Sequence, residues 1–228
     1  MKLENIDGTK LKEMITSSVQ FLNENKDTVD ALNVFPVPDG DTGTNMSATL
    51  TSAAKEMEKV DSNNISEVAN AISRGALKGA RGNSGVILSQ LFRGFAKGLE
   101  DKRIANTIDY ADALKAGADT AYKAVMKPIE GTMLTVARVT AEEAQKIART
   151  NRDFIIFYEK IIEVAKDILD KTPEMLPALK EAGVVDSGGM GVLYILMGSN
   201  MALNGNFDYD AFIAESRPEP VKVQHHEV

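Results

Sequence analysis

The chain has 228 residues, 43% of them apolar, which is enough for one substantial folded core. Its net charge of −7, from 26 Lys and Arg against 33 Asp and Glu, argues against broad nucleic-acid binding, which needs a basic face. There is no cysteine, so disulfides and thiolate metal sites are excluded, and the only histidines are His225 and His226.

The two ends of the chain look different from its middle. The N-terminus lacks the apolar stretch of a signal peptide, and no apolar run reaches the roughly 18 residues that indicate a membrane span. We therefore expect a cytoplasmic protein without a membrane span. Apolar periodicity fades after about residue 204, which predicts a folded domain over 1–205 and a linker or tail over 206–228 toward possible further domains.

Apolar residues recur at helical spacing along most of the chain, which predicts an all-α fold without convincing strands. Thr9 can cap a first helix that extends to about Leu22, and a short second helix is expected over 27–32. Later helices are expected at about 42–60, 66–77, from 85 to 99, 110–126, 130–149, 153–169 and 186–203, with a short segment between 172 and 183.

Short connections between these helices favour antiparallel neighbours, so alternate junctions fall at the same end of the bundle. Counting from the helix that starts near Thr42, the junctions 79–85, 128–132 and 176–189 return to the end where that helix begins. These junctions are rich in Gly, whereas the junctions at the opposite end are ordinary polar turns. The asymmetry predicts one composite site at one rim.

The most unusual stretch is Asn33-Val-Phe-Pro-Val-Pro-Asp39-Gly-Asp41-Thr-Gly-Thr44-Asn45-Met46. Asp39 and Asp41 lie two residues apart in a turn stiffened by prolines. Mg²⁺ prefers oxygen ligands, usually one or two carboxylates together with water and substrate phosphates. Asp41 alone could simply be a helix N-cap. That reading does not account for Asp39, so metal binding is the better interpretation of the pair.

Three other junctions have both a functional and a purely structural interpretation. The segment Gly82-Asn83-Ser84-Gly85 opens a helix, where free N–H groups attract phosphate, or it only closes one helix and caps the next. Arg81 could contact phosphate, although a solvated surface charge is the commoner case. Thr132 with Met133 could line a purine slot or start a helix, and Asp186 with Gly188 could contact a ribose or form a cap.

Several nucleotide-binding signatures are missing from the sequence. There is no G-x-x-x-x-G-K-[ST] motif, no G-x-G-x-x-G motif opening a strand–helix unit, and no protein-kinase signature set. A nucleotide site in this chain would therefore consist of helix termini and metal.

Taken in order, the segments Asp39–Met46, Gly79–Gly85, Gly131–Leu134 and Asp186–Gly189 resemble the DhaL-type domain of the dihydroxyacetone kinase superfamily over about residues 7–205. The form of the first segment looks more like the ATP-binding subunit of bacterial fatty acid kinases. The resemblance implies a DhaL-like antiparallel helical barrel of about eight helices, with ATP or ADP and two Mg²⁺ at one rim.

The resemblance also implies roles for individual residues. Asp39 and Asp41 would hold the metals, and Asn33 would substitute, through its amide oxygen, for a third aspartate of the dihydroxyacetone branch. Thr42, Thr44, Asn45, Ser84 and Gly85 match phosphate contacts. Thr132 and Met133 match adenine contacts, with Asp186 and Gly188 nearby.

By this resemblance, the chain would transfer the ATP γ-phosphate to a fatty acid carboxylate that a separate fatty-acid-binding protein presents, giving an acyl phosphate. Further domains would support a possible homodimer, and this chain alone is expected to bind ATP without full activity. Two alternatives stay open: a dihydroxyacetone kinase nucleotide-binding subunit, and a non-catalytic nucleotide-sensing module.

Overall fold

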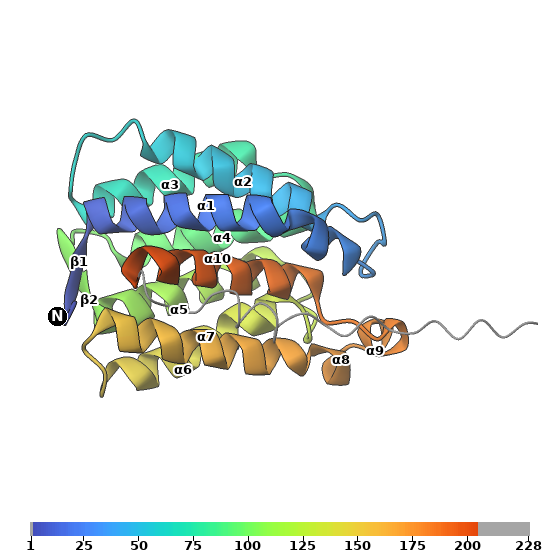
Figure 1. Cartoon of the computed structure of the whole chain (residues 1–228). Helices are drawn as coiled ribbons and strands as arrows, with labels where there is room; N and C mark the ends of the chain where they lie inside the picture. Colours follow the sequence, from blue (N-terminus) through green and yellow to red (C-terminus); the bar gives the residue numbers. More distant parts are fainter. Residues whose placement is uncertain (1, 205–228) are drawn as a thin grey trace, which may run out of the picture.

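The computed structural model describes residues 2–204, so the predicted tail over 206–228 lies outside it. This part of the chain forms eight long helices, two short helices and a two-stranded sheet (Figure 1). In chain order the elements are β1 (Asn5–Asp7), α1 (Gly8–Ala31), α2 (Thr42–Met57), α3 (Ile65–Gly79), α4 (Gly82–Gly98), β2 (Ile104–Asn106), α5 (Thr107–Ala124), α6 (Met133–Ala148), α7 (Phe154–Asp170), α8 (Thr172–Met175), α9 (Pro177–Ala182) and α10 (Ser187–Leu203).

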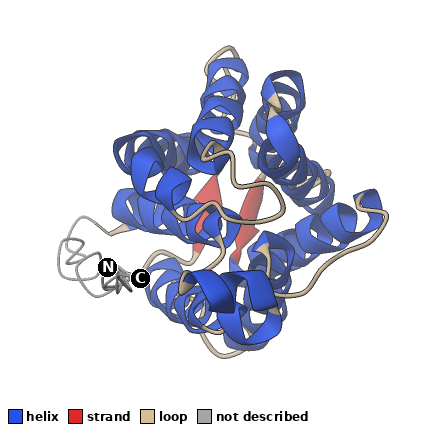
Figure 2. Ribbon diagram, turned by 90° about the vertical axis from the view of Figure 1, so that its right-hand side faces the viewer, coloured by secondary structure: helices blue, strands red, loops and turns tan. Residues whose placement is uncertain are grey.

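The long helices form a closed ring. Each helix from α1 to α7 packs against the next one along the chain, and α10 packs between α7 and α1, which closes the circle. Figure 2 shows the helices around the two strands, which lie at the far end of the ring. The predicted all-α, antiparallel barrel of about eight helices is confirmed.

Helix α10 is buried on nearly all sides, because it contacts α1, α2, α6 and α7. Its sequence explains this position, since apolar and small residues dominate on every face rather than along one stripe. Close packing against α1 depends on Gly198, where an added Cβ would come within 3.0 Å of the Ser17 carbonyl oxygen. These contacts hold α10 firmly against its neighbours in the ring.

The expected break between two N-terminal helices is wrong. Helix α1 runs without interruption from Gly8 to Ala31, and Asp7 rather than Thr9 caps it, accepting a hydrogen bond from the Lys10 N–H at 3.0 Å. The polar run over 23–27 suggested a break because Asn and Asp are weak helix formers. The helix continues because it contains neither Pro nor an internal Gly, and because Val29 is fully buried.

Two short strands accompany the helices, although no convincing strand pattern appears in the sequence. Strands β1 and β2 pair antiparallel, with Ile6 opposite Ala105, and both of these side chains are buried. Each strand has only three residues, too few for an alternating pattern to appear in the sequence. The pair closes the end of the ring at which α1 begins (Figure 1). Among the described helices, none combines the length and apolar character needed to cross a membrane.

Candidate nucleotide site

The four predicted junctions meet around one cavity of about 770 Å³ at the rim opposite the strands. This volume lies within the range of roughly 300–1,000 Å³ that is typical of small-molecule sites. The cavity wall includes residues of the loop 33–41 between α1 and α2, called the acidic loop below, of the α3–α4 junction, of the α5–α6 connection and of the start of α10. The prediction that these junctions come together at one rim is confirmed.

Four helices begin at this cavity: α2, α4, α6 and α10. The residues in the N-cap positions of α2, α4 and α6 are Asp41, Arg81 and Thr132, and none of these side chains makes a capping hydrogen bond. Only α10 is capped by its own N-cap side chain. Uncapped N–H groups and the positive ends of helix dipoles favour an anion such as phosphate.

The interpretation of Asp41 as a simple cap does not hold, because Asp30 at the end of α1 caps α2 instead. The Asp30 carboxylate accepts hydrogen bonds from the Thr44 N–H at 3.0 Å and from the Thr44 hydroxyl at 2.7 Å. Asp41 is therefore left without a capping role and lines the cavity. Thr44, by contrast, faces Asp30 and is not part of the cavity wall.

The acidic loop places Asn33, Asp39 and Asp41 on the same cavity wall. The Asn33 Nδ2 donates a hydrogen bond to Asp39 Oδ1 at 2.8 Å, while the Asn33 Oδ1 is buried without a hydrogen-bond partner within residues 2–204. An unpartnered buried amide oxygen beside a carboxylate suits a cation. The described chain holds no cluster of three or more acidic or His side chains arranged for a metal. Any Mg²⁺ here would thus take further ligands from water or phosphate.

Asp186 caps α10 from a buried position. Its carboxylate accepts a hydrogen bond from the Gly189 N–H at 2.8 Å and is only 5% exposed. Burial raises the pKa of Asp186 to about 6, although backbone hydrogen bonds from Gly189, Met133 and Gly188 act in the opposite direction. The neighbouring Ser187 hydroxyl donates to Thr42 Oγ1 at 3.2 Å, which joins the starts of α10 and α2.

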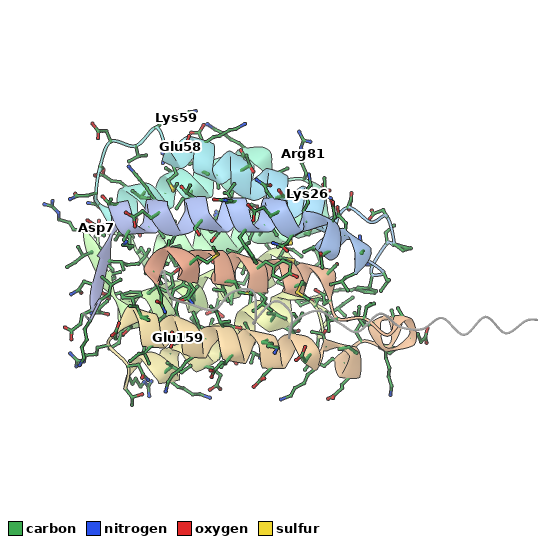
Figure 3. All side chains as sticks on the ribbon, in the orientation of Figure 1. Asp7, Lys26, Glu58, Lys59, Arg81 and Glu159 are labelled. Carbon is green, nitrogen blue, oxygen red and sulfur yellow. The ribbon has the colours of Figure 1, made fainter. Side chains whose placement is uncertain are left out.

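The α3–α4 junction is divided between the cavity and the surface. Gly82, Asn83 and Ser84 line the cavity, as does Asn45 from α2. Gly85 is buried against α2 rather than on the wall. Arg81 is exposed and does not line the cavity; Figure 3 shows it at the edge of the molecule.

Of the remaining predicted site residues, Thr42, Thr132, Met133, Asp186 and Gly188 all line the cavity. The structure thus gathers most predicted positions at one place and leaves Thr44, Gly85 and Arg81 off the wall. The ligand contacts assigned to all of these residues stay predictions.

Sequence reasoning missed part of the wall. Most of the missed residues are apolar, some of them inside the quoted segments, and Lys127 is the one missed cation on the described wall. Ser187 belonged to a quoted motif and could have been included. The missed residues are Phe35, Pro36, Val37, Val86, Ile87, Ala124, Val125, Lys127, Ile129, Leu134 and Ser187.

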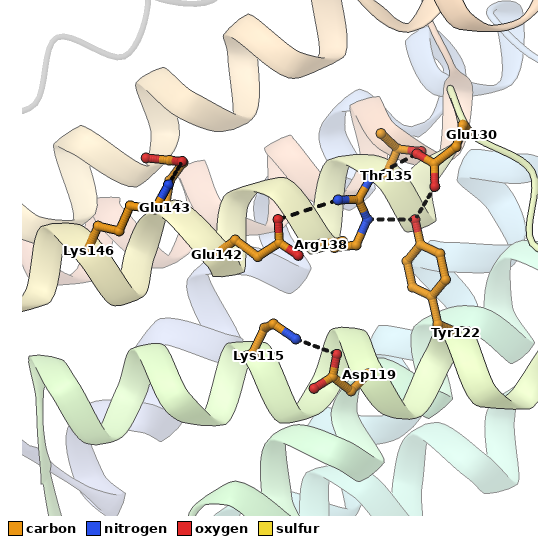
Figure 4. A network of polar contacts seen from close by, with 9 residues as sticks. All are labelled: Lys115, Asp119, Tyr122, Glu130, Thr135, Arg138, Glu142, Glu143 and Lys146. Carbon is orange, nitrogen blue, oxygen red and sulfur yellow. Dashed lines mark hydrogen bonds and ion pairs between the residues drawn. The ribbon is translucent and has the colours of Figure 1, made fainter.

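The α5–α6 connection that carries Lys127 is anchored at its far end by a polar network (Figure 4). The Glu130 carboxylate accepts hydrogen bonds from Tyr122 at 3.0 Å, Thr135 at 2.7 Å and Arg138 at 2.9 Å. Partial burial acts to raise the pKa of Glu130, but these donors outweigh it and hold the pKa below its usual value. The Gly131 N–H in turn donates to the Thr135 hydroxyl at 2.9 Å. The network fixes the connection just before Thr132.

Comparison with known proteins places this chain in a family. The DAK2 domain family model matches residues 36–200. Protein YloV of Bacillus subtilis is 50% identical over 226 residues, covering 99% of this chain and 41% of that protein. An uncharacterized protein of Staphylococcus saprophyticus is 52% identical over 200 residues, covering 88% of this chain and 36% of that protein. The chain thus spans about two fifths of the length of these relatives.

The chain belongs to the DAK2 domain family, the DhaL-type domain of the dihydroxyacetone kinase superfamily. This membership supports a nucleotide-binding, kinase-related domain, in keeping with the helix N-termini that converge on the cavity. The names of the relatives add no substrate.

Proposed function

We propose that this DAK2-domain chain binds Mg–ATP in the rim cavity and transfers the γ-phosphoryl group to a fatty acid carboxylate held by a separate lipid-binding protein. The observation that carries the nucleotide part is the convergence of four helix N-termini, three of them without a capping bond from their own N-cap side chain, on a cavity that also contains Asp39 and Asp41. The choice of a fatty acid as the acceptor rests on the resemblance of the Pro-rich acidic loop to that of bacterial fatty acid kinases.

The charges on the wall support divalent cations as part of the ligand. Asp39, Asp41 and the largely buried Asp186 are among the lining residues, and Lys127 is the only Lys or Arg among the lining residues of the described chain. A polyphosphate alone would be repelled by exposed carboxylates. Asp39 and Asp41, with the amide oxygen of Asn33, would hold Mg²⁺, which when bound neutralises the phosphate charge.

The groups on the wall suit an acceptor that is already ionised. A carboxylate oxygen attacks the γ-phosphorus, the bond from that phosphorus to the β–γ bridging oxygen breaks, and the electron pair leaves on ADP. No proton is removed from the nucleophile, so no general base is needed. Within residues 2–204 the cavity wall contains no histidine, which is compatible with this chemistry. The uncapped N–H groups at the start of α4 bind and orient the phosphates.

The test supplies the protein with γ-labelled ATP and Mg²⁺, together with either a fatty-acid-loaded lipid-binding protein or a dihydroxyacetone-loaded kinase partner. The proposal predicts label in an acyl phosphate, which hydroxylamine traps as a hydroxamate. Label in dihydroxyacetone phosphate would assign the other kinase activity. Transfer to neither acceptor while ATP still binds would favour the nucleotide-sensing module.

A further inference from the structure

The α5–α6 connection has one anchored half and one free half. Glu130 and Gly131 are held by the network of Tyr122, Thr135 and Arg138 (Figure 4). The residues at the start of the connection lie outside this network, and Met126 is 98% exposed. Lys127 lies in this free half, lines the cavity, and makes no hydrogen bond or ion pair with any described residue.

Lys127 stands out by its charge. The cavity wall has three carboxylates, from Asp39, Asp41 and Asp186, and Lys127 is its single cationic residue over the described range. Nearby Arg138 is already engaged with Glu130, Glu142 and the Tyr122 hydroxyl. Helix N-termini supply only about half a unit of positive charge each. Among the cavity-lining residues of the described chain, Lys127 is therefore the one that can bring a full positive charge to a ligand.

The position of Lys127 favours a contact with the terminal phosphate of a bound nucleotide. An acceptor must reach the transferred phosphoryl group from solvent, so that group lies toward the open side of the cavity. Lys127 is exposed, as is Ile129 two residues later, so solvent reaches this part of the wall. A lysine carries a compact charge on a long flexible stem, which allows it to follow a phosphoryl group that moves.

We propose that Lys127 is a catalytic residue that contacts the terminal phosphoryl group of a bound nucleoside triphosphate. This rests on the proposed function, because it needs a nucleotide in the rim cavity. Lys127 donates to an oxygen of the γ-phosphoryl group and stabilises the charge on its equatorial oxygens during transfer. The sequence had offered this role to Arg81, which the structure leaves off the wall.

The experiment compares Lys127→Met with Lys123→Met by calorimetry. Lys123 lies four residues earlier at the end of α5, is likewise exposed, and does not line the cavity. Each variant is titrated with Mg–ADP and with a non-hydrolysable Mg–ATP analogue. We expect K127M to weaken binding of the triphosphate analogue by about 10- to 100-fold, the range of one charge-assisted hydrogen bond, and to change ADP binding less than twofold. K123M should match the wild type for both ligands, and Lys127→Arg should restore most of the triphosphate affinity.

The outcomes separate the two claims. If the wild-type protein binds both ligands and K127M loses neither, or loses both equally, the role of Lys127 is overturned while the nucleotide site stands. If the wild-type protein binds neither ligand at millimolar concentration, the proposed function itself is contradicted, and the role of Lys127 with it.

Discussion

At the scale of single residues, Asn33 is the most informative position in the acidic loop. Its amide nitrogen bonds to Asp39 while its amide oxygen is buried without a partner within the described chain. The sequence had only marked Asn33 as a substitute for a carboxylate. The hydrogen bond explains what an amide does here that a carboxylate cannot: it donates to Asp39 and needs no cation to keep the pair together.

Asn33→Asp should make the loop depend on metal. Two carboxylates would then lie at hydrogen-bond distance without a donor between them, so the metal-free protein should be less stable, by about 1 kcal/mol or roughly 2–4 °C in Tm. Added Mg²⁺ should raise the Tm of N33D by more than that of the wild type. Melting in EDTA and in Mg²⁺ measures both effects, with Asn33→Leu as the control that removes the hydrogen bond without adding charge. An equal Mg²⁺ response in N33D and wild type would argue against a cation at this position.

Asp186 gives a prediction for pH. Burial raises its pKa from 3.8 to about 6, so folding favours the protonated carboxyl. This contribution to stability is fully present below pH 3.8 and is lost as the pH rises through about 6; its size is about 2–3 kcal/mol. Asp186→Asn keeps an oxygen that accepts from Gly189 but cannot ionise. Between pH 4.5 and 7.5, the free energy of unfolding should fall more for the wild type than for D186N. Parallel urea-unfolding curves across this range would contradict the burial argument.

At the scale of elements, the site follows from where helices begin. Helical spacing and short junctions were enough to place the starts of α2, α4, α6 and α10 at one rim, because direction alternates along an antiparallel ring. The identity of the caps could not be read in the same way. Asp30 caps α2 from the end of α1, fourteen residues before Thr44, and a sequence pattern carries no signal for a contact between two helices.

The absence of a sequence signal for contacts between distant segments also explains the other wrong or missed predictions. The polar run over 23–27 predicted a break in α1, yet tertiary burial of Val29 outweighs weak local propensity. Strands of three residues are stabilised by pairing with a distant segment, which no local pattern reveals. Lys127 was missed because a single lysine before Pro128 reads as a surface charge until the cavity is seen.

Gly131 tests how firmly the α5–α6 connection is held. Its φ of 84° disfavours any other residue, and an added Cβ would lie 3.0 Å from Leu176 and Met175 side-chain atoms. Gly40 has a similar φ of 68°, but an added Cβ there would meet only the Asp30 carbonyl oxygen, at 4.0 Å. We expect Gly40→Ala to lower the free energy of unfolding by about 1 kcal/mol through backbone strain alone.

Gly131→Ala should cost about 2–3 kcal/mol, because tight packing adds to the same strain. Urea unfolding of both variants gives the comparison. Equal losses for the two variants would mean that the connection adjusts freely around Gly131.

At the scale of the whole molecule, the ring separates stability from function. The paired strands and ordinary polar turns close one end, and the core runs through the ring. The opposite rim collects the helix N-termini, the acidic loop and the anchored connection. Side chains of this rim that are not buried, such as those of Asp39 and Asp41, can therefore change with little effect on the fold. The family match over residues 36–200 covers most of this architecture.

The central claim is that the acidic loop binds a metal–nucleotide complex, and calorimetry of ATP binding tests it most directly. The wild-type protein should bind ATP with Mg²⁺ and lose that binding in EDTA. Asp39→Ala and Asp41→Ala should abolish Mg²⁺-dependent binding while circular dichroism stays helical, and Asp61→Ala, an exposed aspartate in the α2–α3 connection, should bind as the wild type does. ATP affinity unchanged in both Asp39→Ala and Asp41→Ala, or unchanged in EDTA, would contradict the account.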